Sequence, residues 1–251
     1  MEDEYVIIVR KIPHGFASTY IFNTWTKGTQ IVASAPQGNF YYQKLRDSKN
    51  IVAVCDSNGI SSFLSMAEAI ADGTLDIDLT LLYSARKRNE TIMTERLTEL
   101  SEKTDKFRVI YVFSDERADK CERGFVTKTL IEKYAPASKY SIFVCGSTAL
   151  YNRITPQIAE LKLEKKYIRF GLSGQIVNPS SLPDFPKDEI GKTYFCKVIK
   201  NCELVATIPC STEETLLVSL EREGIKAPSS CRSGECGFCR ARLTKGNVFI
   251  P

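Results

Sequence analysis

The sequence predicts an α/β protein with additional β parts, and three observations support this fold class. The middle of the chain alternates strand-like apolar runs with helical patterns, whereas both ends contain β-type runs. The composition is that of a globular protein, because 43% of the residues are hydrophobic and 25% are charged. A chain of 251 residues is long enough for two or three small domains.

Residues 50–170 carry the alternating pattern. Four short runs there have the β-branched and aromatic content of buried strands: Ile51–Cys55, Leu79–Tyr83, Arg108–Phe113 and Ser141–Cys145. Helical patterns lie between and after these runs, at Ser62–Ala71, Thr91–Glu102, Val126–Lys133 and Ala149–Leu161. Strands alternating with helices of this length predict right-handed βαβ units around a parallel sheet. Ligands of such a sheet bind beyond the carboxyl ends of its strands.

Residues 1–49 precede this block and have a different pattern. They contain two β-type runs, Tyr5–Arg10 and Thr29–Ala35. Between these runs, the apolar spacing of Tyr20–Trp25 indicates a short helix. The pattern therefore separates this segment from the α/β block that follows.

Residues 171–190 and 191–251 form two further blocks. Glycine, proline, serine and aspartate are frequent in residues 171–190, which is typical of an interdomain linker. Residues 191–251 begin with the β-type runs Lys192–Ile199 and Glu203–Ile208, and a helical pattern follows at Thr212–Glu223. A cysteine-rich loop comes next.

Three cysteines in this loop have the spacing of an iron–sulfur ligand set. Cys231, Cys236 and Cys239 form the pattern C-x4-C-x2-C, which is the spacing of plant-type [2Fe–2S] ferredoxins. Thiolates suit such clusters, and Gly234 and Gly237 permit the tight turns of a loop that wraps one. A zinc knuckle and three free cysteines are the alternatives. No His or Cys pair follows at finger spacing, so the loop predicts a [2Fe–2S] site.

Charge and cysteine usage exclude several other classes. The net charge of +4 is mild, and no block of lysine and arginine indicates binding to nucleic acid or to a membrane. The apolar runs are far shorter than the ~20 residues of a membrane span. The acidic start Met1–Glu4 lacks the pattern of a secretory signal, so we expect a cytoplasmic protein. The odd number of cysteines, nine in all, favours metal ligation over a disulfide scaffold.

The C-terminal block resembles a known family. The segments that carry the resemblance are Leu216–Ile225, the cysteine loop Pro228–Cys239 and Arg240–Gly246. They look like the ferredoxin domain of ferredoxin–NADP reductase-like flavoprotein reductases with a fused [2Fe–2S] module, such as the phthalate dioxygenase and vanillate demethylase reductases. The resemblance extends over nearly the whole chain. It implies part of a flavin-binding β-barrel in residues 1–49, a parallel-sheet NAD(P)-binding α/β domain in residues 50–170, and a β-grasp ferredoxin-like domain in residues 191–251.

The resemblance also implies a dinucleotide site after the first strand of the α/β block. The family carries a glycine-rich turn here, and the matching residues of this chain are Gly59, Ile60, Ser61 and Ser62. They lead into a helix N-terminus, which offers N–H groups and a positive dipole end to a pyrophosphate. Cys55 and Asp56 stand where the family has glycines, and a carboxylate at position 56 would repel a phosphate. Simple capping of the helix by Ser61 or Ser62 is the alternative explanation.

Three further positions complete this expected site. Arg86 ends a run that resembles the family's strand that contacts the adenosine ribose. We expect the dinucleotide to be NADH. The alternatives are NADPH, whose 2′-phosphate the arginine would bind, and an arginine that is only solvated. Cys145 and Gly146 resemble the family's C-G-P segment, with Ser147 in place of the proline. The resemblance places Cys145 beside the nicotinamide ring as a catalytic residue, and glycine permits close approach to a planar ring. A small buried residue at a strand end is the alternative for Cys145.

The resemblance implies a flavin, either FAD or FMN, on the first block. Gly15 and Ser18 match a G-x-x-S turn that presents N–H groups to the flavin phosphate, and Pro36–Phe40 resembles the P-x-G-x-F turn that follows. The family's R-x-Y-S motif lies upstream and its fourth cluster cysteine lies downstream, so we expect the chain to be incomplete at both ends. The earlier cysteines of the last block are predicted to be core or surface thiols and not substitute ligands: Cys196, Cys202 and Cys210.

The combined pattern implies an electron-transfer oxidoreductase. Electrons would pass from NAD(P)H to the flavin as a hydride, then singly through the [2Fe–2S] cluster to a partner protein. The expected partner is an oxygenase component or another metalloenzyme, and no nucleic acid or membrane partner is expected. Two alternatives stay open: an electron carrier formed by the ferredoxin end, and a regulatory binding module with a degenerate nicotinamide site.

Overall fold

The computed structural model describes most of the chain: residues 5–11, 15–33, 40–56, 59–171, 178–182, 184–229, 232, 234 and 237–250. The chain divides into two compact units, residues 1–35 with 40–171 and residues 36–39 with 172–251. The finer division into four blocks stays a prediction. Within the described residues, every helix is too short or too polar to span a lipid bilayer.

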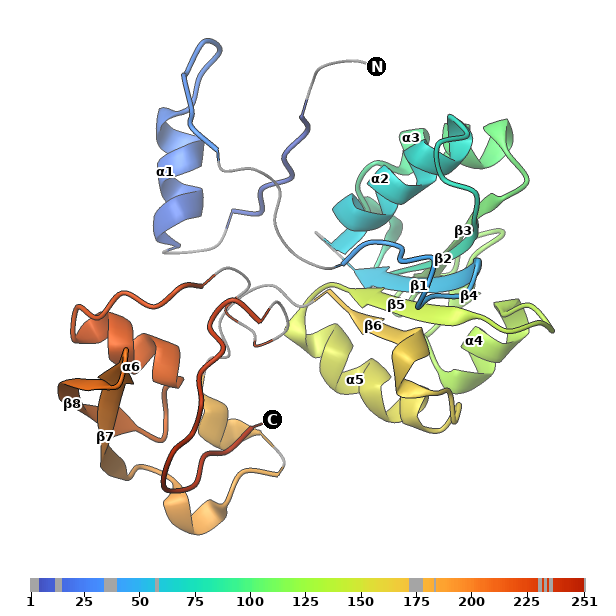
Figure 1. Ribbon diagram of the computed structural model, residues 1–251. Helices are drawn as coiled ribbons and strands as arrows, with labels where there is room; N and C mark the ends of the chain where they lie inside the picture. The colour runs from blue at the N-terminus through green and yellow to red at the C-terminus, as the bar shows by residue number, and fades with distance from the viewer. Residues whose placement is uncertain are drawn as a thin grey trace. The chain divides into compact units, whose positions relative to one another are not determined.

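The first unit is built on a parallel sheet, which has six strands in the described residues (Figure 1). The strands are β1 (Asn50–Asp56), β2 (Asp78–Ala85), β3 (Phe107–Phe113), β4 (Glu122–Arg123), β5 (Ser141–Cys145) and β6 (Ile168–Phe170). They lie in the order β4-β3-β2-β1-β5-β6, and all neighbours are parallel. This arrangement confirms the predicted parallel-sheet fold. The strand order reverses between β1 and β5, which is where such sheets bind their ligands.

Helices cover both faces of this sheet. They are α2 (Ile60–Ala71), α3 (Thr94–Lys103), α4 (Lys128–Tyr134) and α5 (Thr148–Ala159), with the 3₁₀ turns η2 (Arg88–Glu90) and η3 (Lys165–Tyr167). Figure 1 shows α2 and α3 on one side of the sheet and α4 and α5 on the other. A sheet covered on both faces needs strands that are apolar throughout, and five consecutive residues of β1 are buried. The amphipathic α2 contributes Phe63 and Ile70 to the same core.

The predicted strands and helices of the α/β block are confirmed to within a few residues, but several details differ. The short strands β4 and β6 have two and three residues, too few for a recognisable apolar run. The helix expected at Tyr20–Trp25 is α1 (Phe16–Thr24), which begins earlier, after Gly15. The described parts of the runs Tyr5–Arg10 and Thr29–Ala35 form no strand, because no described residue pairs with them in a ladder.

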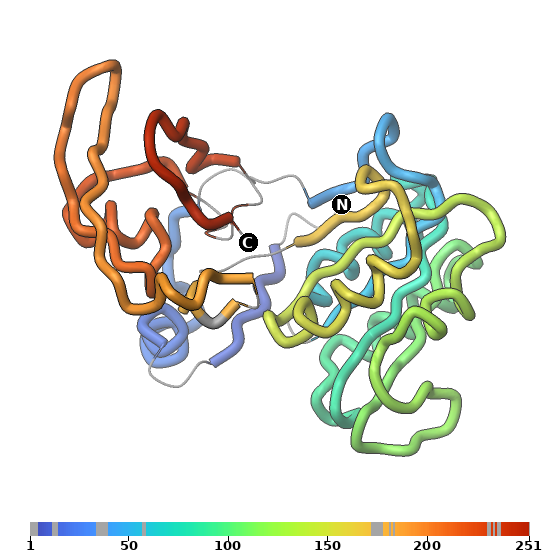
Figure 2. The backbone as a smooth tube through the Cα atoms, turned by 90° about the horizontal axis from the view of Figure 1, so that it is seen from below, coloured from blue at the N-terminus to red at the C-terminus, as the bar shows by residue number. Residues whose placement is uncertain are grey.

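The second unit contains an antiparallel hairpin. β7 (Thr193–Lys200) pairs with β8 (Glu203–Ser211), and the hairpin is drawn in orange in Figure 2. Asn201 and Cys202 form the two-residue turn with positive φ angles of 53° and 67°, as a type I′ turn requires. Two 3₁₀ turns precede the hairpin, η4 (Pro179–Ser181) and η5 (Lys187–Glu189). The small separate sheet agrees with the predicted ferredoxin-like part.

Helix α6 (Leu216–Arg222) follows β8, and Thr215 determines where it begins. The Thr215 hydroxyl accepts a hydrogen bond from the Val218 N–H at 3.4 Å, which is an N-cap. The sequence pattern predicts a longer helix, from Thr212 to Glu223. The observed helix is shorter because Thr215 has extended backbone, with ψ of 152°, and cannot lie inside a helix.

Candidate functional site

The carboxyl ends of β1 and β5 meet where the strand order reverses. Cys55 of β1 lies opposite Cys145 of β5 in the parallel register. The chain leaves β1 through Asp56 towards α2, and it leaves β5 through Gly146 towards α5. The two turns that are expected to contact a dinucleotide are thus brought together at the reversal of strand order, the position at which such sheets form a ligand crevice.

Gly59 packs directly on this crevice. It is the N-cap residue of α2, and a Cβ added to it would lie 1.9 Å from the carbonyl oxygen of Cys145. Only glycine therefore lets the start of α2 approach the end of β5 so closely. The side chain of Ile60 is fully buried in the core. The N-cap makes no side-chain hydrogen bond, so the alternative that Ser61 or Ser62 caps this helix is wrong.

The Cys145 thiol is held by two neighbours. It donates to the carbonyl oxygen of Gly171 at 3.3 Å and lies 3.8 Å from the Ser62 hydroxyl. Burial raises the pKa of the Cys145 thiol above its ordinary value; the hydrogen bond with Ser62 opposes this shift, and the Asp56 carboxylate adds to it. A neutral thiol is a poor nucleophile, so this environment does not favour covalent catalysis by Cys145.

Asp56 and Ser147 are joined by two hydrogen bonds. The Ser147 backbone N–H donates to Oδ1 of Asp56 at 2.7 Å, and its hydroxyl donates to Oδ2 at 2.6 Å. The same hydroxyl accepts from the Leu150 N–H at 3.2 Å and thereby caps α5. Gly146 leaves room for the carboxylate, since a Cβ there would lie 2.2 Å from Oδ1. Two positions at which this chain departs from the glycine and proline of the resembling family are therefore in direct contact.

A segment from the first block packs onto the same region. A Cβ on Gly171 would lie 2.9 Å from carbon atoms of the Phe40 ring, so this contact requires glycine. The Phe40 ring also contacts Phe63 and Phe143, with centroid distances of 5.9 and 5.5 Å. Phe40 ends the P-x-G-x-F turn, whose other residues, 36–39, lie outside the described residues. Nothing in the sequence pattern indicates the contact between Phe40 and Gly171.

A buried ion pair fixes this segment to β6. Nη1 of Arg169 lies 3.4 Å from Oδ1 of Asp47, and the two side chains are only 4% and 0% exposed. Arg169 also donates to the Tyr41 carbonyl oxygen at 3.3 Å, and Asp47 accepts the Gln43 N–H at 2.8 Å. Burial lowers the pKa of Arg169, and Asp47 opposes this shift. Sequence reasoning missed the pair because its members are 122 positions apart.

Arg86 lies just beyond β2, the strand that neighbours β1. Its guanidinium contacts the Glu90 carboxylate at 2.5 and 3.2 Å, and its backbone N–H donates to the same carboxylate at 3.3 Å. The Arg86 side chain is 73% exposed and is open to a ligand. Glu90 offsets its positive charge, and the choice between NADH and NADPH stays a prediction.

Gly15 and Ser18 lie at the start of α1. Gly15 is the N-cap residue, and the buried Ser18 donates its hydroxyl to the Gly15 carbonyl oxygen at 3.4 Å. The first turn of α1 contains no acidic residue, so its N–H groups are compatible with a phosphate. The flavin contact expected for both residues stays a prediction.

The predicted cluster ligands are only partly described. Cys231 and Cys236 lie outside the described residues, and Cys239 is half-buried with a free thiol. Among the described residues, no three His, Cys, Asp or Glu side chains gather as a metal site. Cys202 is exposed and Cys210 is buried, as expected for surface and core thiols. The ligand assignment stays a prediction.

Three described positions of the cysteine loop have left-handed backbone. Arg232, Gly234 and Gly237 have φ angles of 59°, 86° and 74°, in the left-handed region. Left-handed positions allow a short loop to direct backbone N–H groups towards an enclosed anion, as iron–sulfur sites require. Gly234 and Gly237 have the backbone conformation that tight turns use, and the turns of the loop around a cluster stay a prediction. Arg232 is also held by Glu221 of α6 through two contacts of 2.6 Å.

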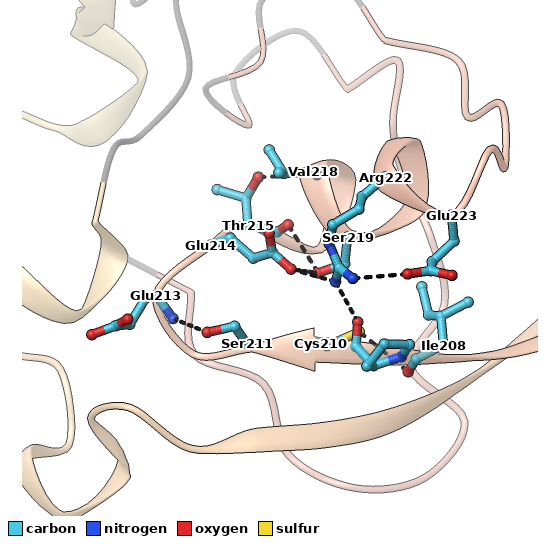
Figure 3. Close-up of polar contacts among 11 residues, drawn as sticks. Ile208, Cys210, Ser211, Glu213, Glu214, Thr215, Val218, Ser219, Arg222 and Glu223 are labelled. Carbon is cyan, nitrogen blue, oxygen red and sulfur yellow. Dashed lines mark hydrogen bonds and ion pairs between the residues drawn. The ribbon is translucent and has the colours of Figure 1, made fainter.

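A polar network joins α6 to β8 (Figure 3). Arg222 donates to the Pro209 carbonyl oxygen and to the Glu214 carboxylate, both at 2.7 Å. Ser219 is fully buried and donates to Glu214 at 2.9 Å. The buried Ser219 hydroxyl has a hydrogen-bond partner, so its burial is tolerated. The network holds α6, the helix that contains Glu221, against the hairpin.

Two family models match the chain. The model of the oxidoreductase NAD-binding domain matches residues 54–155, and the model of the 2Fe-2S iron-sulfur cluster binding domain matches residues 199–251. The first match includes Gly59, Arg86 and Cys145. The second includes the cysteine loop.

Curated relatives align with almost the whole chain. The ferredoxin reductase component of 3-ketosteroid-9-alpha-monooxygenase from Mycobacterium tuberculosis is 24% identical over 98% of this chain. The glycine betaine monooxygenase reductase subunit from Chromohalobacter salexigens is 21% identical over 98% of it. The chain spans 67% and 70% of the lengths of these two relatives.

Solved structures share the fold. The cytochrome P450 reductase GcoB from Amycolatopsis aligns with a TM-score of 0.56 and 21% identity, over 64% of this chain and 50% of that one. A ferredoxin NADP+ reductase from Neisseria gonorrhoeae aligns with a TM-score of 0.52 and 19% identity, over 63% and 70%. The family matches identify an oxidoreductase NAD-binding domain and a 2Fe–2S cluster binding domain, and the solved structures show that this part of the chain shares the fold of flavin-dependent reductases. The chain combines an NAD-binding domain with a fused 2Fe–2S domain, which confirms the resemblance drawn from its sequence.

Proposed function

We propose that this chain transfers electrons from NAD(P)H through a flavin and a [2Fe–2S] cluster to a partner protein in the cytoplasm. The two family matches supply a domain for the dinucleotide and a domain for the cluster. Its relatives include reductase components of monooxygenases, which supports an oxygenase component as the partner. Another metalloenzyme is the alternative partner.

The observation that carries this proposal is the packing of Gly59 on the Cys145 carbonyl oxygen. It brings the start of α2, which has no acidic residue in its first turn, beside the end of β5. These groups fit a dinucleotide, because the N-terminal turn of a helix and a close glycine contact occur at the reversal of strand order. Its pyrophosphate would lie at Gly59, Ile60, Ser61 and Ser62, its ribose at Arg86 and its nicotinamide at Cys145 and Gly146.

Separate parts of the chain would hold the two resident cofactors. Gly15 and Ser18 would hold the phosphate of FAD or FMN, and the cluster would be held by Cys231, Cys236 and Cys239. A bound flavin supplies the chemistry that converts a two-electron hydride transfer into single electrons. The residues of this chain would bind and orient these groups, and the half-buried Cys145 thiol, whose pKa is raised by burial, would leave one side of the site uncharged.

A regulatory binding module is a second candidate, and Asp56 favours it. Its carboxylate stands at the crevice where the resembling family has glycine, and like charge weakens the binding of a dinucleotide phosphate. In that case NADH would leave the spectra of the reconstituted chain unchanged. A cluster that dithionite reduces, but NADH with added flavin does not, would instead identify an electron carrier.

Visible spectra of the full chain test the proposed function. The chain would be reconstituted anaerobically with iron, sulfide and FAD or FMN, and spectra would be recorded before and after NADH. We expect the flavin bands and the cluster absorption to bleach together. Cys239→Ser should remove the cluster absorption, whereas Cys202→Ser, at an exposed cysteine of the same unit, should retain it. A colourless chain that takes up zinc contradicts the proposal.

A further inference from the structure

The crevice between β1 and β5 contains a negative charge of its own. Asp56 accepts the N–H and the hydroxyl of Ser147, both neutral donors, at 2.7 and 2.6 Å. In the described part of the chain, no lysine or arginine forms an ion pair with Asp56. The position of the carboxylate is therefore fixed, and among the described residues its charge is not paired with a cation.

Helix capping alone does not account for this carboxylate. Ser147 already caps α5, because its hydroxyl accepts the Leu150 N–H at 3.2 Å. Thr127 caps α4 through the equivalent bond to the Leu130 N–H, at 3.3 Å. Among the described residues, no carboxylate accepts a hydrogen bond from the Thr127 hydroxyl. A hydroxyl is thus a sufficient cap in this chain, and Asp56 adds charge to one helix start only.

Gly146 determines where the charge acts. Oδ1 of Asp56 would lie 2.2 Å from a Cβ on Gly146, so the carboxylate takes up the side-chain space of the residue next to Cys145. The Cys145 thiol is also within its influence, since Asp56 contributes to the raised pKa of that thiol. The charge therefore acts on the surface that Cys145 and Gly146 would present to a nicotinamide ring.

The two helices that begin at the crevice differ in electrostatic character. α5 begins after Ser147 and has the Asp56 carboxylate at its N-terminus. α2 begins after Gly59, with neither a side-chain cap nor an acidic residue in its first turn. An anionic pyrophosphate is therefore favoured at α2 and disfavoured at α5. This difference directs the nicotinamide end of a dinucleotide to the side of Asp56.

We propose that Asp56, held by Ser147, is a specificity-determining residue that favours the oxidised, cationic nicotinamide over the reduced, neutral one. The inference rests on the proposed dinucleotide function. When NADH passes a hydride, two electrons and one proton, to the flavin, its ring is left with one positive charge. A fixed carboxylate beside that ring attracts this charge and acts far less on the neutral ring. The pair thereby tightens NAD+ binding relative to NADH and assists hydride release.

Binding of three nucleotides to the full chain tests this inference by calorimetry. NAD+ and NADH differ in ring charge, and ADP-ribose has the pyrophosphate but no nicotinamide. Asp56→Asn keeps the size of the side chain and an acceptor for the Ser147 N–H, but it removes the charge. We expect the affinity for NAD+ relative to NADH to fall roughly three- to tenfold in this variant. ADP-ribose should bind equally well or slightly more tightly.

Asp105→Asn is the matched control. Asp105 is exposed, lies near the amino end of β3, and its replacement changes the net charge by the same amount. This variant should leave the ratio of NAD+ to NADH affinity unchanged. Asp56→Gly, which removes the whole side chain, should shift the ratio in the same direction as Asp56→Asn.

The inference is overturned if Asp56→Asn weakens NAD+ and NADH equally, which a purely structural role would produce, or if it leaves the ratio unchanged. Failure of the unaltered chain to bind any of the three nucleotides has a different meaning. It would overturn the proposed function, and this inference with it.

Discussion

The carbonyl oxygen of Cys145 lies 1.9 Å from the position that a Cβ on Gly59 would take. The backbone of β5 has little freedom to move away, because it is paired with β1 on one side and β6 on the other. The contact therefore joins the start of α2 to the end of β5 at a fixed distance. The shape of the crevice therefore depends on the absence of a side chain at Gly59.

Replacement of Gly59 tests this dependence. Gly59→Ala should lower the free energy of unfolding by about 1–3 kcal/mol, because the added methyl group forces the backbone to shift. Urea unfolding followed by circular dichroism measures the change. Ser65→Ala, on the exposed face of the same helix, should cost much less. Equal stability of Gly59→Ala and the unaltered chain would refute the close contact.

Breaking the buried ion pair of Arg169 and Asp47 should lower the free energy of unfolding more than Gly59→Ala does. Arg169→Met should destabilise the chain by about 3–5 kcal/mol, because it leaves a buried carboxylate without its cation. Thermal and urea unfolding would measure the loss. The double variant Arg169→Met with Asp47→Leu should regain most of the stability, since neither charge then remains buried.

An exposed ion pair in the same part of the chain provides the control for this variant. Lys166 pairs with Glu164 at 2.8 Å, with more than half of each side chain exposed. Lys166→Met should leave the midpoint of unfolding almost unchanged, because water screens such pairs. If Arg169→Met behaved in the same way, the buried ion pair would not be formed in solution.

The raised pKa of Cys145 predicts slow alkylation that is confined to alkaline pH. Burial keeps this thiol protonated above its ordinary pKa of 9.0, so the reactive thiolate is scarce at pH 8. Iodoacetamide labelling read by mass spectrometry should modify the exposed Cys202 first. Ser62→Ala removes a hydrogen bond that lowers the pKa of Cys145, so it should slow labelling at that thiol further. Similar labelling rates at both cysteines would argue against this environment.

The raised pKa of Cys145 also makes the free energy of unfolding depend on pH in the alkaline range. The pKa of Cys145 is higher in the folded chain than in the unfolded one, so its contribution to stability is complete below about pH 9. It is lost as the pH rises from there through the raised value. Cys145→Ala should weaken this alkaline decline in unfolding experiments.

The contact between Glu221 and Arg232 is expected to lengthen the lifetime of a reconstituted cluster. Glu221→Gln removes the charge that holds Arg232 at two distances of 2.6 Å, so the loop loses a restraint. The visible absorption of the cluster should decay about two- to threefold faster, a modest change because the pair is partly exposed. Glu203→Gln, at an exposed position in β8, should leave the decay unchanged. Identical decay in all three proteins would show that the contact does not restrain the loop.

In the α/β block, the strands that the sequence predicts include those with apolar residues on both faces, such as β1 and β5. β6 escapes prediction because three residues are too few, and its central residue is Arg169. The charge of that arginine is tolerated in the sheet only because Asp47 lies against it, and no local pattern links two positions so far apart. Sequence patterns report local periodicity, whereas this strand depends on a distant partner.

The candidate site was predictable in its parts but not in its contacts. The turn at Gly59 and the Cys145–Gly146 segment are recognisable from residue types. Their close approach is not, because it depends on the neighbouring positions of β1 and β5 in the sheet. Asp56 illustrates the same limit: the sequence suggests repulsion of a phosphate, but only the structure shows that Asp56 accepts two hydrogen bonds from Ser147.

Phe40 is linked to the crevice through one intervening residue. Its ring lies against Gly171, and the carbonyl oxygen of Gly171 accepts the hydrogen bond of the Cys145 thiol. The ring of Phe40 and the thiol of Cys145 are therefore connected through Gly171. A displacement of the chain near position 40 would shift the position of the sulfur atom. A fluorine label on the Phe40 ring would therefore report on ligand binding in the crevice without contacting the ligand.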